Sequence, residues 1–273
     1  MTVVGGAQRH ARRARRSVIL KRLTQVGFVG YGLLHLALGW LCLQILLGRG
    51  AADDGQTGAF RTIAAQPLGR FVLIVTAIGL IAMAVWQLLL AAVGHQDEQG
   101  WKRAAERLAS LSRVVIYAAL AFTAWKVVRG TATPSARQQQ DFTADLLRHG
   151  AGQAIVVVAG IAVVGLGIGL AVYGLLKKFV RHLRTGEMSP AVRTASVRLG
   201  QLGYLAKGFA YVVVGVLVAL AGIRYEPSRS GGLDAALKTL PQQPFGPLLL
   251  AVVAAGLAAF GAYCFVQARY RDV

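Results

Sequence analysis

The chain reads Arg198-Leu199-x-x-x-Gly203-x-x-x-Lys207-Gly208 at the start of one long apolar segment. The same pattern stands earlier as Arg22-Leu23-x-x-x-Gly27-x-x-x-Tyr31-Gly32, and a weaker copy, Arg107-Leu108-x-x-x-Ser112, lies between them. The matched arginines are 85 and 91 residues apart. Self-similarity over such a distance indicates tandem repeats, which determine the architecture before any single helix is considered.

A second matched element follows each opening after a polar stretch. Residues 59–69 align without gaps on residues 236–246, and residues 142–152 are the middle counterpart. Apolar residues recur there at helical spacing, so we expect short amphipathic helices around 59–66, 142–149 and 233–241, lying in the outer headgroup layer. The chain thus divides into a basic cytoplasmic tail and three repeats of two spans each, over 1–20, 21–94, 107–178 and 198–269.

The composition places most of this chain in a membrane. It is 55% hydrophobic and 15% charged with a mean hydropathy of +0.54, whereas soluble domains carry about 25% charged residues. Six apolar segments reach the roughly 20 residues that cross a bilayer. None of them contains Asp or Glu; they lie near 24–48, 68–93, 109–129, 153–176, 201–223 and 246–267.

These spans predict an all-α membrane protein with six transmembrane helices. A two-span unit returns the chain to its starting side, so three tandem copies share one orientation. The simplest packing of three such copies is a pseudo-threefold bundle. One glycine pattern in the fourth span, Gly165-x-x-x-Gly169 with Gly160 and Gly167 nearby, predicts a close-packed helix face.

The net charge of +19 and the pI near 11 would indicate a nucleic-acid partner in a soluble chain. The positions of the basic residues argue against a nucleic-acid-binding protein. Of the 30 Lys and Arg residues, 18 fall on the side of the membrane that carries both termini and 10 fall on the other side. The positive-inside rule then places both termini in the cytoplasm, as an even number of spans allows. We expect no nucleic-acid partner.

One stretch also resembles a known family. It reads Gly203-Tyr204-x-x-Lys207-Gly208-x-x-Tyr211-x-x-x-Gly215 and is followed by Gln243-Pro244-Phe245-Gly246. Together these are similar to the three-copy bacterial membrane family named domain of unknown function 1206, over residues 22–269. The resemblance implies an actinobacterial protein of the inner (plasma) membrane. Copy one departs from the pattern at Tyr31 and His35, and copy two lacks the Gln-Pro-x-Gly. The family has no known activity, so no residue roles carry over.

His35 is the sharpest candidate for a functional residue inside the membrane. It lies in mid-span, where ionisable groups are costly and often functional. With Tyr117 and Tyr211 it could form an intramembrane polar site. The alternative is a structural imidazole that is hydrogen-bonded to a neighbouring helix, for instance to Tyr211 or Tyr117.

Several basic residues are candidates for contacts with anionic phospholipids. Arg113 and Lys207 enter their spans by only a turn or two, so snorkelling to the cytoplasmic headgroups explains them. The alternative is a basic vestibule or a lipid-phosphate site between repeats. The candidate contacts are Arg113, Lys177, Lys178, Arg181 and Lys207.

Catalytic, cofactor and metal-ligand patterns are missing from the chain. The five histidines lie at different depths, and no His/Cys/acid cluster has ligand spacing. We therefore expect no enzyme and no cofactor, but a structural or partner- and lipid-binding membrane module. An uncoupled transporter or pore is the alternative, with an intramembrane enzyme as a minor one. A polar axial cavity containing His35 would favour the pore, and a filled interior the module. The sequence does not indicate which protein would be the partner of such a module.

Overall fold

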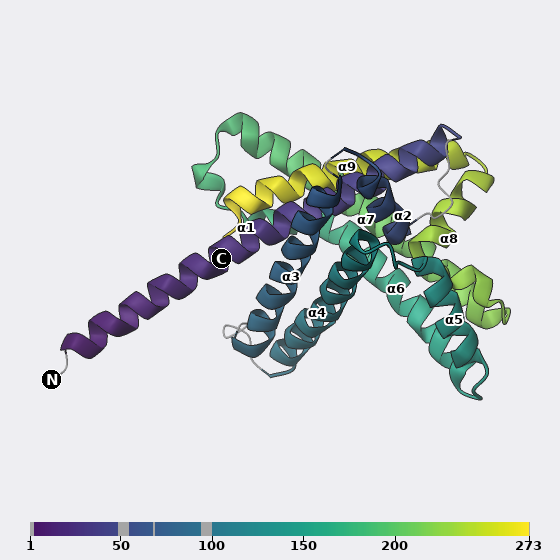
Figure 1. Ribbon diagram of the computed structural model, residues 1–273, viewed down its shortest axis with the longest axis horizontal. Helices are drawn as coiled ribbons and strands as arrows, with labels where there is room; N and C mark the ends of the chain where they lie inside the picture. Colours follow the sequence, from purple (N-terminus) through teal and green to yellow (C-terminus); the bar gives the residue numbers. More distant parts are fainter. Residues whose placement is uncertain (1–2, 49–54, 68, 94–99, 273) are drawn as a thin grey trace.

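The computed structural model describes residues 3–48, 55–67, 69–93 and 100–272 (Figure 1). Within these ranges the chain forms helices and no strand. Six helices are long and apolar enough to span a membrane, as predicted. They are α1 (Val3–Leu46), α3 (Gly69–Val93), α4 (Gly100–Val128), α6 (Gly152–Leu175), α7 (Pro190–Ile223) and α9 (Gly246–Tyr270).

Three short helices connect the spans at one end of the molecule, where sequence predicted them. They are α2 (Gly55–Ala64), α5 (Ser135–Leu147) and α8 (Gly232–Thr239). Each packs against the other two, so together they form a cap. Figure 1 shows the cap on one side and both chain termini on the other. We call these the cap end and the basic end.

The cap repeats the same joint three times. In each repeat a glycine begins the return span, and its N–H donates to a carbonyl three residues earlier at 2.8 Å. A Cβ on Gly69, Gly152 or Gly246 would lie 1.7, 1.6 or 2.3 Å from a carbonyl oxygen of the preceding segment. Only glycine permits this approach, which explains why the three elements align in sequence.

The spanning helices follow one another around a ring in the order α1, α3, α4, α6, α7, α9. Each helix packs extensively against the next one in this order, with one exception. Within the described residues, α4 and α6 do not pack extensively against each other. These two helices, which belong to repeat two, are also the least buried: 28% and 17% of their apolar windows, against 50–61% for α1, α3 and α9. The expected pseudo-threefold order is present, but the ring is open between α4 and α6, which run apart toward the basic end (Figure 1).

One position at this opening differs between the repeats. In repeats one and three the two spans meet at equivalent small residues: Gly30 lies on Gly79, and Ala206 lies on Gly256. The position of Gly30 and Ala206 is occupied in repeat two by Val115, whose side chain is 68% exposed. A β-branched side chain there prevents the close backbone approach that small residues allow.

The glycines of α6 pack against α7 and not across the opening. Gly160, Gly167 and Gly174 recur every seven residues and touch α7 so closely that a Cβ on any of them would clash. Gly165 and Gly169 face open space instead. The predicted Gly165-x-x-x-Gly169 packing face is therefore wrong: a seven-residue repeat keeps side chains on one helix face when helices supercoil.

Candidate functional site

Lys207 lies inside the ring, midway along α7. It stands nine residues after Arg198 and sixteen before Ile223, or about 13 Å and 24 Å along the helix axis. Its Nζ donates a hydrogen bond to the Tyr31 hydroxyl and lies 4.7 Å and 4.4 Å from the ring centres of Tyr31 and Phe260. A desolvated cation–π contact contributes about 2 kcal/mol. The amine thus turns toward the interior, not toward the headgroups as the sequence had indicated.

Tyr31 joins the first helices of all three repeats. Its ring, in α1, meets Tyr117 of α4 edge-on at 5.3 Å, and its hydroxyl accepts from Lys207 of α7. Phe260 of α9 completes the surroundings at 6.0 Å. Tyr31 therefore links three helices that do not pack extensively on one another. We call Lys207, Tyr31, His35, Tyr117 and Phe260 the amine cluster.

His35 takes part in this cluster through its own helix. Its side chain is 5% exposed, and Nδ1 lies 2.8 Å from the Tyr31 carbonyl oxygen. Because a carbonyl only accepts, Nδ1 is the nitrogen that carries the proton. The ring also packs edge-on against Tyr31 at 4.4 Å and in a tilted arrangement against Phe260 at 4.7 Å. The hydrogen bond expected to a neighbouring helix is instead made within α1.

The two tyrosines expected beside His35 occupy different places. Tyr117 is buried and reaches Tyr31, while Tyr211 is half-buried, one helical turn beyond Lys207. The structure brings Lys207 and Tyr31 into this site, a pairing that sequence reasoning missed. A signal was present, since Tyr31 occupies the position in repeat one that Lys207 occupies in repeat three, and equivalent positions of parallel helices lie at similar depth.

A second layer of aromatic rings surrounds the amine cluster toward the basic end. Tyr204 packs edge-on against Phe260 at 5.2 Å and stacks on Phe179 at 5.4 Å. Tyr263 is completely buried, and its hydroxyl has no hydrogen-bond partner in the described residues. Arg271 lies 5.6 Å from the ring centres of both Phe28 and Trp86. The interior at this end is therefore aromatic and cationic.

A basic hollow of about 550 Å³ lies where α6 gives way to α7. Three of its lining residues, Lys177, Arg193 and Arg198, are cationic and exposed, and none is acidic. The remaining lining residues are Thr185, Met188, Pro190, Thr194, Val197 and Gln201. The other expected lipid contacts, Arg113, Lys178 and Arg181, are exposed but do not line this hollow.

An apolar hollow of about 650 Å³ adjoins the basic one. The two share Pro190, Thr194 and Arg198, and the apolar hollow continues along α7 to Leu199. The first turns of α7 thus carry a cationic surface and an apolar surface side by side. Such a combination matches an amphipathic molecule with an anionic headgroup.

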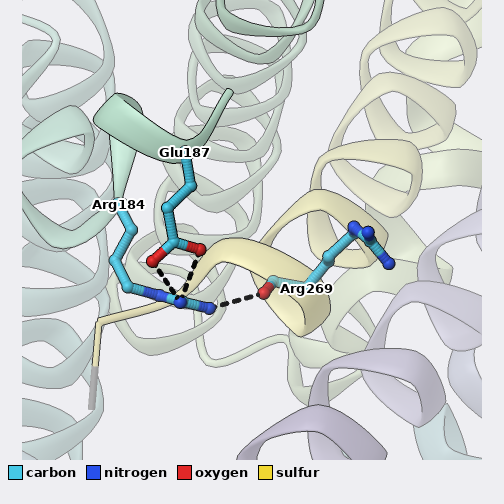
Figure 2. Close-up of polar contacts among 3 residues, drawn as sticks. All are labelled: Arg184, Glu187 and Arg269. Atoms are coloured by element: carbon cyan, nitrogen blue, oxygen red, sulfur yellow. Dashed lines mark hydrogen bonds and ion pairs between the residues drawn. The ribbon is translucent and has the colours of Figure 1, made fainter. Parts of the chain in front are cut away.

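The connection after α6 is held in place by the C-terminal end of α9. The Arg184 guanidinium pairs with both carboxylate oxygens of Glu187 at 2.6 Å and donates to the Arg269 carbonyl at 2.8 Å (Figure 2). The Arg184 N–H also donates to the Tyr270 carbonyl, at 2.9 Å. These bonds fix residues 178–187, including Thr185 on the wall of the basic hollow.

His182 lies in the same connection and is kept neutral. Its Nδ1 is 3.1 Å from the Tyr173 hydroxyl. Partial burial, followed by the positive charges of Arg271 and Arg181, lowers the pKa of His182 to about 4. Within the described part of the chain, no group of three or more His, Cys, Asp or Glu side chains could hold a metal ion.

Comparisons with known proteins support the repeat division. A Bacillus subtilis (strain 168) protein named "Uncharacterized protein YxxB" is 25% identical over 255 residues, which cover 93% of this chain and 92% of the relative. No solved structure matches the chain. The family model described as Domain of Unknown Function (DUF1206) matches three times, at residues 26–94, 108–177 and 202–271. The chain therefore belongs to the DUF1206 family and contains three copies of its domain.

Proposed function

We propose that this protein is a non-enzymatic module of the bacterial inner membrane that binds anionic phospholipid at the basic hollow. The observation that carries the proposal is the pair of adjoining hollows at the start of α7. Lys177, Arg193 and Arg198 supply three cations for a phosphate headgroup, and the apolar hollow supplies a surface for an acyl chain. Basic residues near a membrane surface attract anionic lipid by about 1 kcal/mol each.

The distribution of charge between the two sides of the protein also supports lipid binding at the basic hollow. The hollow lies on the side of both termini, which the positive-inside rule assigns to the cytoplasm. That side has a surplus of 13 positive charges, against 4 on the other. Orientation requires far fewer charges, and lipid binding accounts for the surplus.

The packing of side chains inside the ring supports a binding module rather than a pore. A pore needs a continuous polar path along the ring axis, whereas aromatic rings of the amine cluster fill the interior at the level of Tyr31. No member of the amine cluster lines the two hollows at the start of α7.

The test compares thermal unfolding in nanodiscs of phosphatidylcholine and of phosphatidylglycerol, at low and high salt. We expect a higher Tm in phosphatidylglycerol, and a smaller difference at high salt because screening weakens exposed charge pairs. The combined variant Lys177→Gln, Arg193→Gln and Arg198→Gln should lose most of the difference. The matched control removes three exposed cations from the cap end: Arg137, Arg148 and Arg224.

Two outcomes would refute the proposal. One is equal Tm values in both lipids, which would leave the charge surplus as a signal for orientation only. The other is an equal loss in the control variant, which would show a response to net charge without a site.

A further inference from the structure

Lys207 is a cation inside the membrane without an anionic partner. Its amine has three N–H donors, and the one hydrogen bond that the structure gives it is to Tyr31. Lys207 takes no part in the ion pairs Arg184–Glu187 and Arg229–Glu226, which lie among the described residues. None of the six apolar segments contains an acid that could move into contact. An ionisable residue at this depth is costly, and its anion has to come from outside the chain.

The opening of the ring lies beside this amine. Lys207 and Tyr31 are both partly accessible, although they lie inside the ring. Tyr117, the cluster's member from α4, stands at one edge of the opening, and α6 packs against the helix that carries Lys207. Gly165 and Gly169 of α6 meet no atom within 4 Å of an added Cβ. The open position between α4 and α6 is thus the side on which the ring around the partly accessible amine is not closed by helix packing.

We propose that the amine cluster binds the carboxylate of a long-chain fatty acid, which enters between α4 and α6 and pairs with Lys207. The acyl chain would occupy the opening between α4 and α6, two helices that carry exposed large apolar side chains such as Phe122 and Ile161. The carboxylate accepts from the two N–H groups of the ammonium that Tyr31 does not use. This site is separate from the basic hollow, so the proposal does not rest on phospholipid binding there.

The depth of Lys207 selects a carboxylic acid over a phospholipid. The Cα atom of Lys207 lies about 13 Å along the helix axis from that of Arg198, inside the apolar span that begins near residue 201. A phosphodiester stays charged and hydrated, so drawing it to this depth costs several kcal/mol. A carboxylic acid moves inward at lower cost in its neutral form. It then releases its proton to water, and the ammonium of Lys207 stabilises the carboxylate that remains.

The experiment uses the full chain in phosphatidylcholine nanodiscs and the fluorescent fatty acid cis-parinaric acid, with empty nanodiscs to correct for partitioning. We expect saturable binding of one molecule per chain that oleate displaces and methyl oleate does not. Lys207→Gln should weaken binding at least tenfold, Lys207→Arg should retain it, and Arg113→Gln is the control that removes an exposed cation from α4. Wild-type affinity in Lys207→Gln would overturn the proposal.

Two further measurements keep the proposal testable if Lys207→Gln fails to fold. Methyl oleate or phosphatidylglycerol that displaces the probe from the wild type as well as oleate would exclude a specific carboxylate site. A photoactivatable fatty acid should label peptides of α4 and α6 in the wild type, and labelling confined to α1 and α3 would exclude entry between α4 and α6. Neither result bears on the basic hollow, whose variants leave Lys207 unchanged.

Discussion

Lys207 and Tyr31 occupy equivalent positions in repeats three and one, and the amine of Lys207 donates a hydrogen bond to the hydroxyl of Tyr31. Equivalent residues of parallel helices lie at similar depth, so two of them can meet across the ring interior. The equivalent in repeat two is Ile116, which is 49% exposed. The Lys207–Tyr31 pair is thus formed by two copies of one repeat position that face inward, while the third copy is exposed.

We predict that Tyr31→Phe lowers the free energy of unfolding by about 1–3 kcal/mol, because it removes the acceptor from a partly buried ammonium. Lys207→Met should cost much less or even stabilise, since an apolar side chain needs no acceptor. Thermal unfolding of both variants and of the double variant measures their coupling. If Lys207→Met costs as much as Tyr31→Phe and the effects add, the hydrogen bond does not hold the cluster together.

The cap joints make a prediction about glycine. Gly152→Ala should destabilise by about 1–3 kcal/mol, because the new Cβ would lie 1.6 Å from the Leu146 carbonyl oxygen and the backbone must shift. Gly165→Ala is the control, since it meets open space and should stabilise α6 slightly through helix propensity. Comparing the Tm of both variants tests the joint, and equal values would argue against it.

The stability of the protein should decrease as the pH is lowered through the range in which His182 titrates. The folded pKa of about 4 lies below the unfolded value of about 6.5, so the unfolded chain binds more protons between these values. The contribution of His182 is complete above pH 6.5 and is lost as the pH falls toward 4. The difference in Tm between wild type and His182→Gln isolates this group, because all other residues are the same in both proteins. A difference that does not change between pH 7 and 4 would contradict the assignment.

The topology is testable without purification. We expect a fluorescent protein that matures only in the cytoplasm to fluoresce when fused to either terminus. Alkaline phosphatase, which is active only outside, should be active when inserted at residues 129–134 on the cap side. A silent terminal fusion that is nevertheless expressed would reverse the predicted orientation.

The repeat division and the six spans could be read from sequence because they depend on local properties. Segment length, apolar content and the absence of acids identify a span regardless of its neighbours. The cap glycines recur because each copy builds the same joint, in which the backbone leaves no room for a Cβ. The family match and the helix boundaries agree with this division.

The direction in which the Lys207 side chain points could not be predicted from the sequence. A cation two turns into a span can extend toward the headgroups or turn inward, and the choice depends on what the neighbouring helices offer. Here Tyr31 and Phe260 come from α1 and α9, more than 50 residues away along the chain on either side, and they offer a hydroxyl and two ring faces. His35 likewise found its acceptor in its own helix, not in a neighbour.

The sequence by itself determined the number of spans and the short helices of the cap, because these follow from periodicity and internal repetition. Only the tertiary structure decided where the ring stays open and which side chains meet inside it. Both outcomes depend on how closely two backbones approach. The identity of single residues such as Val115 and Gly79 controls that approach, but its consequence appears only when the helices are packed.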